Sequence, residues 1–500
     1  MVSESSQLPS SLSRRSLLRG AGLAGIGVFT ASVLAACGGA TTATSSTTAS
    51  SSSSAVQKTS STSSTAVKAA ATSSTQGVVG KNPTGKKGEV TWLVRTGLSE
   101  NNWEKNVVEP GFAKAYPNLH LNVIIAPWAQ FDPKLFTLFA AGTPVDVWSH
   151  WGQSGFADYV HKGMVADLTP MINADHYDLN AFQPGLVDIY KVQGKYLGLP
   201  NDTTYGMPLI YDQSILQKAG VTPPGQDWTN PWTWDQMVEA AKKMTTNYGA
   251  PTATYGLSMS TDLQLLARLG GIDLFTWSVT ENGGIAKPSD YHADAPEVLT
   301  AVQAVYDLMY KDKVMPTPQL GSALSAGNLG PFRAGKLGMN WNGGWLYWTY
   351  KPAIHSFKWV PAADPKLKAN ATTEYTDPWM LSSKSKDPEG AWTFIKYLLS
   401  YDSQVAYAKA TGAPPGNAKA ADVWLQTMTE PTGLTVAQLK QVTQGALKDG
   451  KESYNHLLVN YGPYITAENQ AMSNVWNGKT SPADGLKQAK AAVDAVLAKM

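Results

Sequence analysis

From Glu89 onward the sequence alternates between strand-like and helix-like segments, and this alternation limits the folds open to the chain. The segments EVTWLVRT (89–96) and LHLNVIIAP (119–127) are rich in the β-branched and aromatic residues that strands prefer. Between them, residues 103–116 carry a helical pattern. A strand–helix–strand unit closes most readily into a parallel sheet. The sequence therefore predicts an α/β fold with a parallel sheet.

Later segments carry clear helix start signals. Thr233 followed by Gln236 fits a capping box, with apolar residues at helical spacing behind it. Asp387 before Pro388 and Ser481 before a second proline each predict a helix whose first position is proline. This alternation continues over roughly 410 residues, which exceeds a usual single core. We expect two lobes.

The N-terminal 36 residues predict an export signal. Arg14 and Arg15 precede a short apolar run at 21–36, which is the order of a basic and an apolar signal region. The segment 13–19 resembles a twin-arginine signal. Residues 34–37, Leu-Ala-Ala-Cys, resemble the bacterial lipobox, in which the cysteine is acylated. Residues 1–36 are therefore predicted to be a twin-arginine-like lipoprotein signal peptide, and Cys37 the lipidated first residue of the mature protein.

Residues 37–87 predict a tether behind that anchor. Almost all of 40–76 is Ser, Thr or Ala, a composition that cannot bury enough apolar surface to offset the entropy of ordering. Cys37 is the only cysteine of the 500 residues, so no intrachain disulfide is possible. We expect a flexible tether that holds a folded body near the outer face of a membrane.

Composition narrows the function classes. The net charge is +2, so there is no basic field of the kind that nucleic-acid binding requires. The 7 histidines include no pair three or four residues apart, so a helix-borne zinc pair is absent. We predict no metal site and no cofactor. Two carboxylates of a hydrolytic enzyme could come from anywhere in the chain, so the missing local motifs argue only weakly against an enzyme.

Six segments, in order, resemble those of the bacterial extracellular solute-binding proteins, family 1, which include the maltose-binding type and serve ABC importers. AAGTPVDVW (140–148) resembles the A-x-G-x-x-P-D-V segment of that family. The other five are 194–224, 231–245, 332–345, 383–400 and 476–489. Each motif alone is modest. The six together span nearly all of 88–500.

The resemblance implies an α/β, two-lobed periplasmic-binding-protein fold with a ligand cleft between lobes joined by crossing hinge segments. It places lobe 1 at 88–203 with 380–428, and lobe 2 at 204–379 with 429–500. The crossings should lie near 202–205 and 376–381. It implies a monomer that is not an enzyme, is held on the extracellular face of the cell membrane, and delivers a small solute to an ABC permease.

The solute is expected to be a mono- or oligosaccharide, because aromatic rings can lie against sugar faces while amides and carboxylates bond the hydroxyls. The chain has 17 Trp and 21 Tyr. The candidate contacts, taken from loops that the family places at the cleft, are Arg95, Thr96, Trp148, His150, Trp151, Tyr205, Trp277, Asn340, Trp341, Asn342, Trp345, Asp377 and Trp379.

Some of these candidates could instead have an ordinary structural role. Trp148 could be a core residue, Arg95 could form a surface ion pair, and His150 could be a local hydrogen-bond partner. Two other functions also stay open. One is a secreted carbohydrate-active enzyme, and the other is the same family with a polyol, sugar phosphate or peptide as ligand. A phosphate ligand would need more cationic side chains in the cleft than Arg95 alone.

Overall fold

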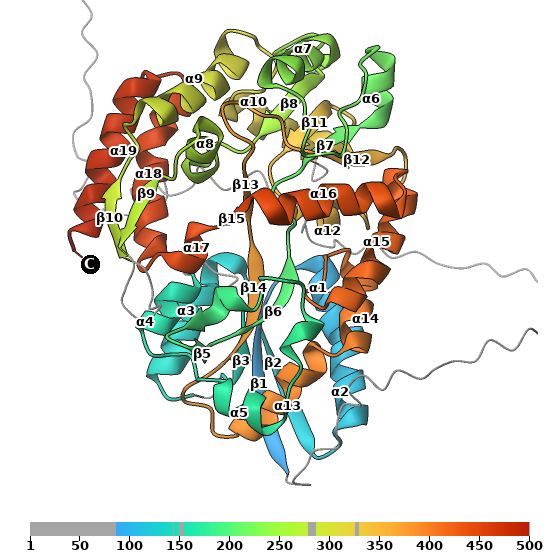
Figure 1. Ribbon diagram of the computed structural model, residues 1–500, viewed down its shortest axis with the longest axis vertical. Helices are drawn as coiled ribbons and strands as arrows, with labels where there is room; N and C mark the ends of the chain where they lie inside the picture. The colour runs from blue at the N-terminus through green and yellow to red at the C-terminus, as the bar shows by residue number, and fades with distance from the viewer. Residues whose placement is uncertain (1–86, 144, 150–154, 279–286, 326–329, 500) are drawn as a thin grey trace, which may run out of the picture.

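Two separate β-sheets organise the chain, one in each of two lobes (Figure 1). The computed structural model describes residues 87–143, 145–149, 155–278, 287–325 and 330–499. The α/β expectation is confirmed. Lobe 1 is built on the five-stranded sheet and lies in the lower half of Figure 1, and lobe 2 is built on the four-stranded sheet in the upper half.

The sheet of lobe 1 has the strand order β2-β1-β3-β14-β6. β1 and β2 are parallel and pair over eight residues, from Gly88 with Leu119 to Arg95 with Ala126. β14 runs antiparallel to both β3 and β6, so it enters this sheet from the side of lobe 2. The bounds are β1 Gly88–Arg95, β2 Leu119–Ala126, β3 Val147–Trp148, β6 Leu199–Thr203 and β14 Thr376–Leu381, with a separate hairpin of β4 Lys191–Val192 and β5 Lys195–Tyr196.

Helices cover this sheet and close a core rich in aromatic rings. The predicted helix at 103–116 is a continuous helical stretch that starts earlier and contains a π-helical turn at Glu104–Val108. Trp92 on β1 packs edge-to-face against Trp103, Trp379 and Phe394, and all four rings are buried. The helices are α1 Leu98–Trp103, α2 Glu109–Ala115, α3 Trp128–Ala140, α4 Phe156–His161, α5 Thr169–Ala174, α13 Pro388–Leu398 and α14 Tyr401–Thr411, with single turns at Leu179–Ala181 and Asp188–Tyr190.

The sheet of lobe 2 has the order β12-β7-β11-β8, in which β11 and β8 are parallel. Two short pairs flank it, β9 with β10 and β13 with β15. The strands are β7 Leu209–Asp212, β8 Tyr255–Met259, β9 Phe275–Ser278, β10 Lys287–Tyr291, β11 Leu337–Trp341, β12 Trp359–Ala362, β13 Thr372–Glu374 and β15 Gly450–Glu452.

The predicted helix starts in both lobes are confirmed. Thr233 accepts a hydrogen bond from the Gln236 N–H, and the Gln236 side chain accepts one from the Thr233 N–H. Asp387 and Ser481 also cap their helices, and each side chain accepts a hydrogen bond from the N–H three residues later. The helices of lobe 2 are α6 Gln213–Lys218, α7 Trp234–Met244, α8 Leu263–Gly270, α9 Pro296–Tyr310, α10 Pro318–Ser325, α11 Gly330–Arg333, α12 Leu346–Tyr350, α15 Ala418–Thr432, α16 Val436–Asp449, α17 Tyr454–Leu457, α18 Tyr461–Trp476 and α19 Pro482–Leu497.

Two connections between the sheets lie side by side at the centre of the molecule. One joins β6 to β7 through residues 204–208, and the other joins β13 to β14 at Tyr375. Glu374 links the two, because its buried carboxylate accepts hydrogen bonds from the N–H groups of Thr204, Tyr205 and Gly206. The predicted lobe boundaries stay a prediction.

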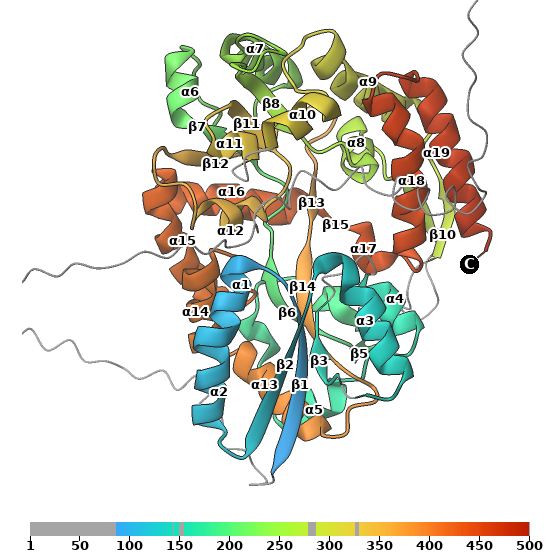
Figure 2. The ribbon, with the colours of Figure 1, turned by 180° about the vertical axis from the view of Figure 1, so that it is seen from behind.

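Helix α17 also brings lobe 2 against lobe 1. It packs on α4 (Figure 2), and the Asp158 side chain of α4 accepts a hydrogen bond from the Asn460 N–H just before α18. A Cβ added to Gly155 would lie 1.3 Å from the carbonyl oxygen of Asn455. Only glycine therefore permits this close approach, which sets α18 opposite α3.

Candidate ligand cleft

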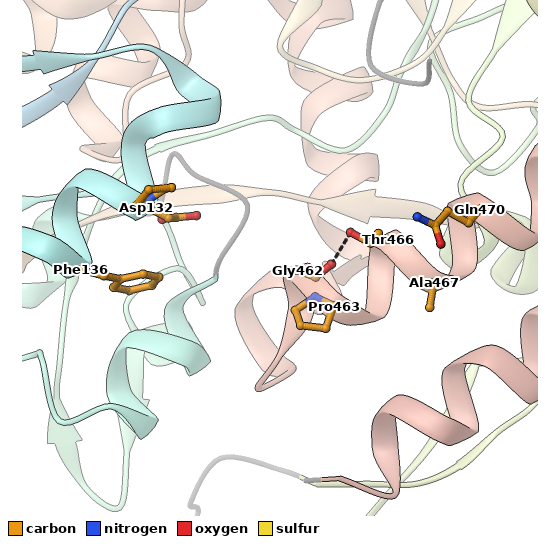
Figure 3. Close-up of a pocket in the computed structure, with 8 residues that line it drawn as sticks. Asp132, Phe136, Gly462, Pro463, Thr466, Ala467 and Gln470 are labelled. Atoms are coloured by element: carbon orange, nitrogen blue, oxygen red, sulfur yellow. Dashed lines mark hydrogen bonds between the residues drawn. The ribbon is translucent and has the colours of Figure 1, made fainter. Parts of the chain in front are cut away.

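An open cavity of about 550 Å³ lies between helix α3 of lobe 1 and helix α18 of lobe 2 (Figure 3). Asp132, Pro133 and Phe136 line it from α3. The opposite wall is the first half of α18, which contributes Gly462, Pro463, Thr466, Ala467 and Gln470. The cavity is therefore a space between lobes, the position expected for a ligand in a two-lobed binding protein.

The walls of this cavity combine an aromatic ring with a few polar groups. Asp132 is 5% exposed, and its carboxylate accepts a hydrogen bond from the Tyr159 hydroxyl at 2.6 Å. Phe136 packs edge-on against the same tyrosine, with ring centroids 6.0 Å apart. Across the gap, Thr466 and Gln470 add a hydroxyl and an amide (Figure 3). A ring with a few fixed polar groups is the usual make-up of a small-molecule site.

Lobe 1 presents an acid–base cluster to lobe 2 at the ends of its strands. Arg95, the last residue of β1, donates to both carboxylate oxygens of Glu100, at 2.6 and 3.3 Å. Burial opposes the charge of Arg95, but Glu100 and then Asp377 raise the pKa of its guanidinium. Its side chain is still 21% exposed. Arg95 is thus a cation held in place by carboxylates, which is also the ion pair foreseen as its alternative.

Two aspartates face each other across strands β14 and β6. Asp377 is the cross-strand partner of Asp202, and Asp202 is 3% exposed. The Asp202 carboxylate accepts from the Tyr407 hydroxyl at 2.5 Å and from the Asn201 amide at 3.0 Å. Burial, and after it the charge of Asp377, raises the pKa of Asp202 well above its usual range. The pair therefore holds a proton more tightly than separate aspartates would.

Lobe 2 presents an aromatic and acidic group next to the second connection. Trp345 is partly exposed and meets Tyr375 edge-on, with ring centroids 5.4 Å apart. The Tyr375 hydroxyl accepts from the Gln264 amide at 2.9 Å and donates to Asp262 at 3.3 Å. Burial raises the pKa of Asp262, against the hydrogen bonds from Gln264. Lobe 2 thus offers the flat ring of Trp345 and the hydrogen-bond acceptor Asp262 on either side of Tyr375.

Gly343 sets the position of Trp345. A Cβ on Gly343 would lie 2.4 Å from ring atoms of Trp345, so the indole lies directly over this glycine. The neighbouring Gly344 packs against the first connection, where an added Cβ would lie 1.7 Å from the Thr204 carbonyl oxygen. Gly343 and Gly344 therefore set the position of Trp345 and hold its segment against the first connection between the lobes.

Three of the predicted contact tryptophans lie in the lobe cores. Trp148, Trp341 and Trp379 are each 0% exposed. Trp148 packs edge-on against Tyr159, and the Trp379 indole donates to Asn201 at 2.9 Å. A side chain without exposed surface cannot touch a solute in this arrangement of the lobes. For Trp148 the core alternative describes what the structure shows.

The other predicted residues fall into two groups. Arg95, Thr96, Trp345 and Asp377 are partly or fully exposed at the strand ends and connections between the lobes. Elsewhere, Tyr205 is 3% exposed and donates to Gln183, while Asn340 donates to the Tyr350 hydroxyl at 2.5 Å and accepts from the Asn342 amide.

The remaining predicted residues are Trp277 and those that lie outside the described ranges. Trp277 lies on β9 and packs on Phe275 and Tyr454. His150, Trp151 and Cys37 lie outside the described residues. Within the described ranges no group of histidines, cysteines and acids could hold a metal ion. No helix in those ranges is both long and apolar enough to span a membrane.

The cavity residues Asp132, Phe136, Thr466 and Gln470 were not among the candidates. Ligands in open α/β sheets bind beyond the carboxyl ends of the strands. Helix α3 follows strand β2 directly, so this rule, applied to the strand predicted at 119–127, points to the start of α3 and to Asp132.

Comparison with models of protein families shows the family to which the chain belongs. The model of the bacterial extracellular solute-binding protein family matches residues 97–405, more than half of the chain. The chain is a bacterial extracellular solute-binding protein. The resemblance seen in the six sequence motifs is confirmed. This solute-binding protein shares its two-lobed fold with an ABC substrate-binding protein of Listeria monocytogenes in complex with cycloalternan, with a TM-score of 0.67 and 21% identity over 83% of this chain and 100% of that one.

Two curated relatives of the chain carry different descriptions. A Brucella abortus (strain 2308) protein described only as a binding protein is 24% identical over 401 residues, which cover 78% of this chain and 89% of that protein. The sn-glycerol-3-phosphate-binding periplasmic protein of Rhizobium meliloti (strain 1021) is 26% identical over 206 residues, 40% of this chain and 43% of that protein. Of these similar proteins, one is described in complex with cycloalternan and another as binding sn-glycerol 3-phosphate.

Proposed function

We propose that this solute-binding protein captures a carbohydrate between its lobes and delivers it to the transmembrane subunits of an ABC importer. The observation that carries the proposal is the cavity between α3 and α18, with a phenyl ring and a carboxylate on one wall and a hydroxyl and an amide on the other. Sugars offer apolar C–H faces and polar hydroxyl edges, so they match such walls.

The proposed binding site joins this cavity to the strand-end groups. Phe136 and Trp345 would lie against sugar faces, and Asp132, Asp377 and Gln470 would bond hydroxyls. Arg95 and Thr96 border the same edge of lobe 1. The two connections next to Glu374 would act as the hinge about which the lobes close on the ligand. Closure would remove the ligand from water and create the form that a permease recognises.

The proposed location is the outer face of the cell membrane. Acylation of Cys37 would anchor the protein there, and the Ser/Thr/Ala segment would let the folded body reach the permease. The family supports a periplasmic or extracellular place. The anchor itself rests on the lipobox resemblance.

A thermal-shift screen tests the proposal. The purified protein is heated with neutral mono- and oligosaccharides, polyols, sugar phosphates and short peptides. A ligand that binds only the folded state adds about 2.7 kcal/mol of stability at a hundred times its Kd. A raised Tm with a sugar that is recovered unchanged supports the carbohydrate-binding role. Conversion of the sugar into products would favour the secreted enzyme, and a shift with peptides alone would reject the carbohydrate ligand.

A further inference from the structure

Helix α8 of lobe 2 carries two buried polar side chains on one of its faces. Gln264 and Arg268 lie four positions apart, so they project from the same side of the helix. Gln264 is 1% exposed and Arg268 is 5% exposed. Buried polar groups are normally held by hydrogen bonds. The partners of these two residues therefore show which segments α8 fastens together.

Gln264 uses its whole amide group to join three segments of lobe 2. Its Nε2 atom donates to the Asp262 carboxylate at 2.6 Å and to the Tyr375 hydroxyl at 2.9 Å. Its Oε1 atom accepts from the Ser453 hydroxyl at 3.3 Å and from the Tyr454 N–H at 3.1 Å. A glutamine amide has two N–H donors and two acceptor lone pairs, so all of its capacity is used. Gln264 therefore ties the second connection, at Tyr375, to the start of α17, at Tyr454.

Arg268 binds the same region one turn further along α8. Its terminal nitrogens donate to the Thr373 hydroxyl at 3.0 Å and to the carbonyl oxygens of Lys451 and Glu452 at 3.0 and 2.7 Å. Thr373 lies on β13, which leads into the second connection, and the two carbonyl groups lie on β15, which leads into α17. The guanidinium also lies over the Tyr454 ring, 5.1 Å from its centroid. Arg268 thus holds β13, β15 and α17 together.

Helix α17 and the residue before it are bonded to the second connection on both sides of Tyr375. The Ser453 N–H donates to the Glu374 carbonyl oxygen at 3.0 Å. The Nε2 atom of His456 donates to the Thr376 carbonyl oxygen at 2.9 Å. The same helix packs on α4 of lobe 1 and is followed by α18. The placement of α17 on this connection therefore decides where α18 stands.

We infer that Gln264 and Arg268 are positioning residues that set the distance of α18 from α3, an inference that rests on the proposed function in taking the gap between these helices as the ligand site. The described lining of that gap contains neither side chain. Both act through α17, because they fix its start to the second connection. Without their hydrogen bonds, α17 and the connection would move separately, and α18 would lose its fixed place opposite α3.

The distance between the two helices tests this inference without any ligand. Lys134→Cys on α3 and Asn469→Cys on α18 introduce cysteines at exposed positions of the full-length protein, which also carries Cys37→Ser, and both are spin-labelled. Pulsed electron paramagnetic resonance then gives the distribution of distances between the labels. We expect Gln264→Leu and Arg268→Met each to widen this distribution at least about twofold, because neither new side chain can form the hydrogen bonds of the one it replaces.

Leu266→Ala on the same helix is the matched control. Leu266 is buried and projects from the side of α8 opposite Gln264. The control removes core packing but leaves the hydrogen bonds of α8 in place, so it should lower the urea midpoint and leave the width of the distribution unchanged. Ser453→Ala removes only one bond to Gln264 and should widen the distribution to a smaller extent. It keeps the test decisive if Gln264→Leu does not fold.

The outcomes separate the inference from the function beneath it. Distributions that stay as narrow as in the unaltered protein overturn the inference, because the contact of α17 with α4 would then hold α18 by itself. Equal widening by Leu266→Ala also overturns it, since general loss of stability would be the cause. Failure of every sugar in the thermal-shift screen would reject the carbohydrate proposal, while the label distances would still decide whether these residues position α18.

Discussion

Glutamine in place of Glu374 should change how the stability of the protein depends on pH. Glu374 is 6% exposed, and its Oε1 atom accepts from the Thr203 hydroxyl and from the N–H groups of Thr204 and Tyr205. Its Oε2 atom accepts from the Gly206 N–H at 2.7 Å. This one carboxyl group therefore joins the second connection between the lobes to the first.

The size of the effect follows from the pKa. Burial raises the pKa of Glu374 from 4.5 to about 7, against the opposing hydrogen bonds from Thr203 and the three N–H groups. Because the folded-state pKa lies above the unfolded one, the folded state binds more protons between these values, and stability falls as pH rises. A shift of this size corresponds to about 3 kcal/mol, lost between about pH 4.5 and pH 7.

Glu374→Gln cannot ionise, so it should lose this part of the pH dependence. A glutamine Oε1 can keep three donors, but its amide NH₂ would face the Gly206 N–H, at a cost of about 1–3 kcal/mol. We expect the variant to be less stable than the unaltered protein at pH 5. Between pH 5 and pH 8, the free energy of unfolding of the variant should rise by about 3 kcal/mol relative to that of the unaltered protein.

Urea unfolding at pH 5 and pH 8 measures this difference, with Glu239→Gln on the exposed surface of α7 as the control. The control should show the same free energy difference at both pH values. A carboxylate with several N–H donors can instead have a depressed pKa. A variant that becomes relatively less stable as pH rises would show that the four donors outweigh burial, and would refute our reasoning.

Three further changes test the site and the anchor. Gly343→Ala should move the Trp345 ring, because its Cβ would lie 2.4 Å from the indole, and should weaken sugar binding at least about tenfold in fluorescence titrations. Phe136→Ala removes the ring on the α3 wall and should cost about 1–2 kcal/mol of binding in calorimetry, while unaltered affinity would place the sugar elsewhere. Cys37→Ser should move the protein from the membrane fraction to the soluble fraction; continued sedimentation with membranes would reject the lipid anchor.

Local sequence signals were sufficient for the secondary structure and the fold class. The Thr233 capping box and the Asp387 cap are set by contacts between residues three positions apart, so their patterns can be read directly. The strands at the start of the folded body show in their β-branched and aromatic residues, although they pair over a longer distance, from Gly88 with Leu119 to Arg95 with Ala126. The pairing of Arg95 with Glu100 is also local, because only five positions separate them. The length of the alternating region predicted two lobes, and the resemblance between motifs supplied the periplasmic-binding-protein fold and its crossings.

The cleft depends on tertiary structure. Asp132 and Thr466 lie more than 300 positions apart and meet only because α17 packs on α4 and brings α18 opposite α3. Trp341 ends strand β11 and Trp345 follows it by four positions, yet only Trp345 keeps exposed surface, since Trp341 is buried in the core of lobe 2. A sequence shows which side chains can bind a sugar, whereas the packing of the lobes decides which of them are left uncovered to do so.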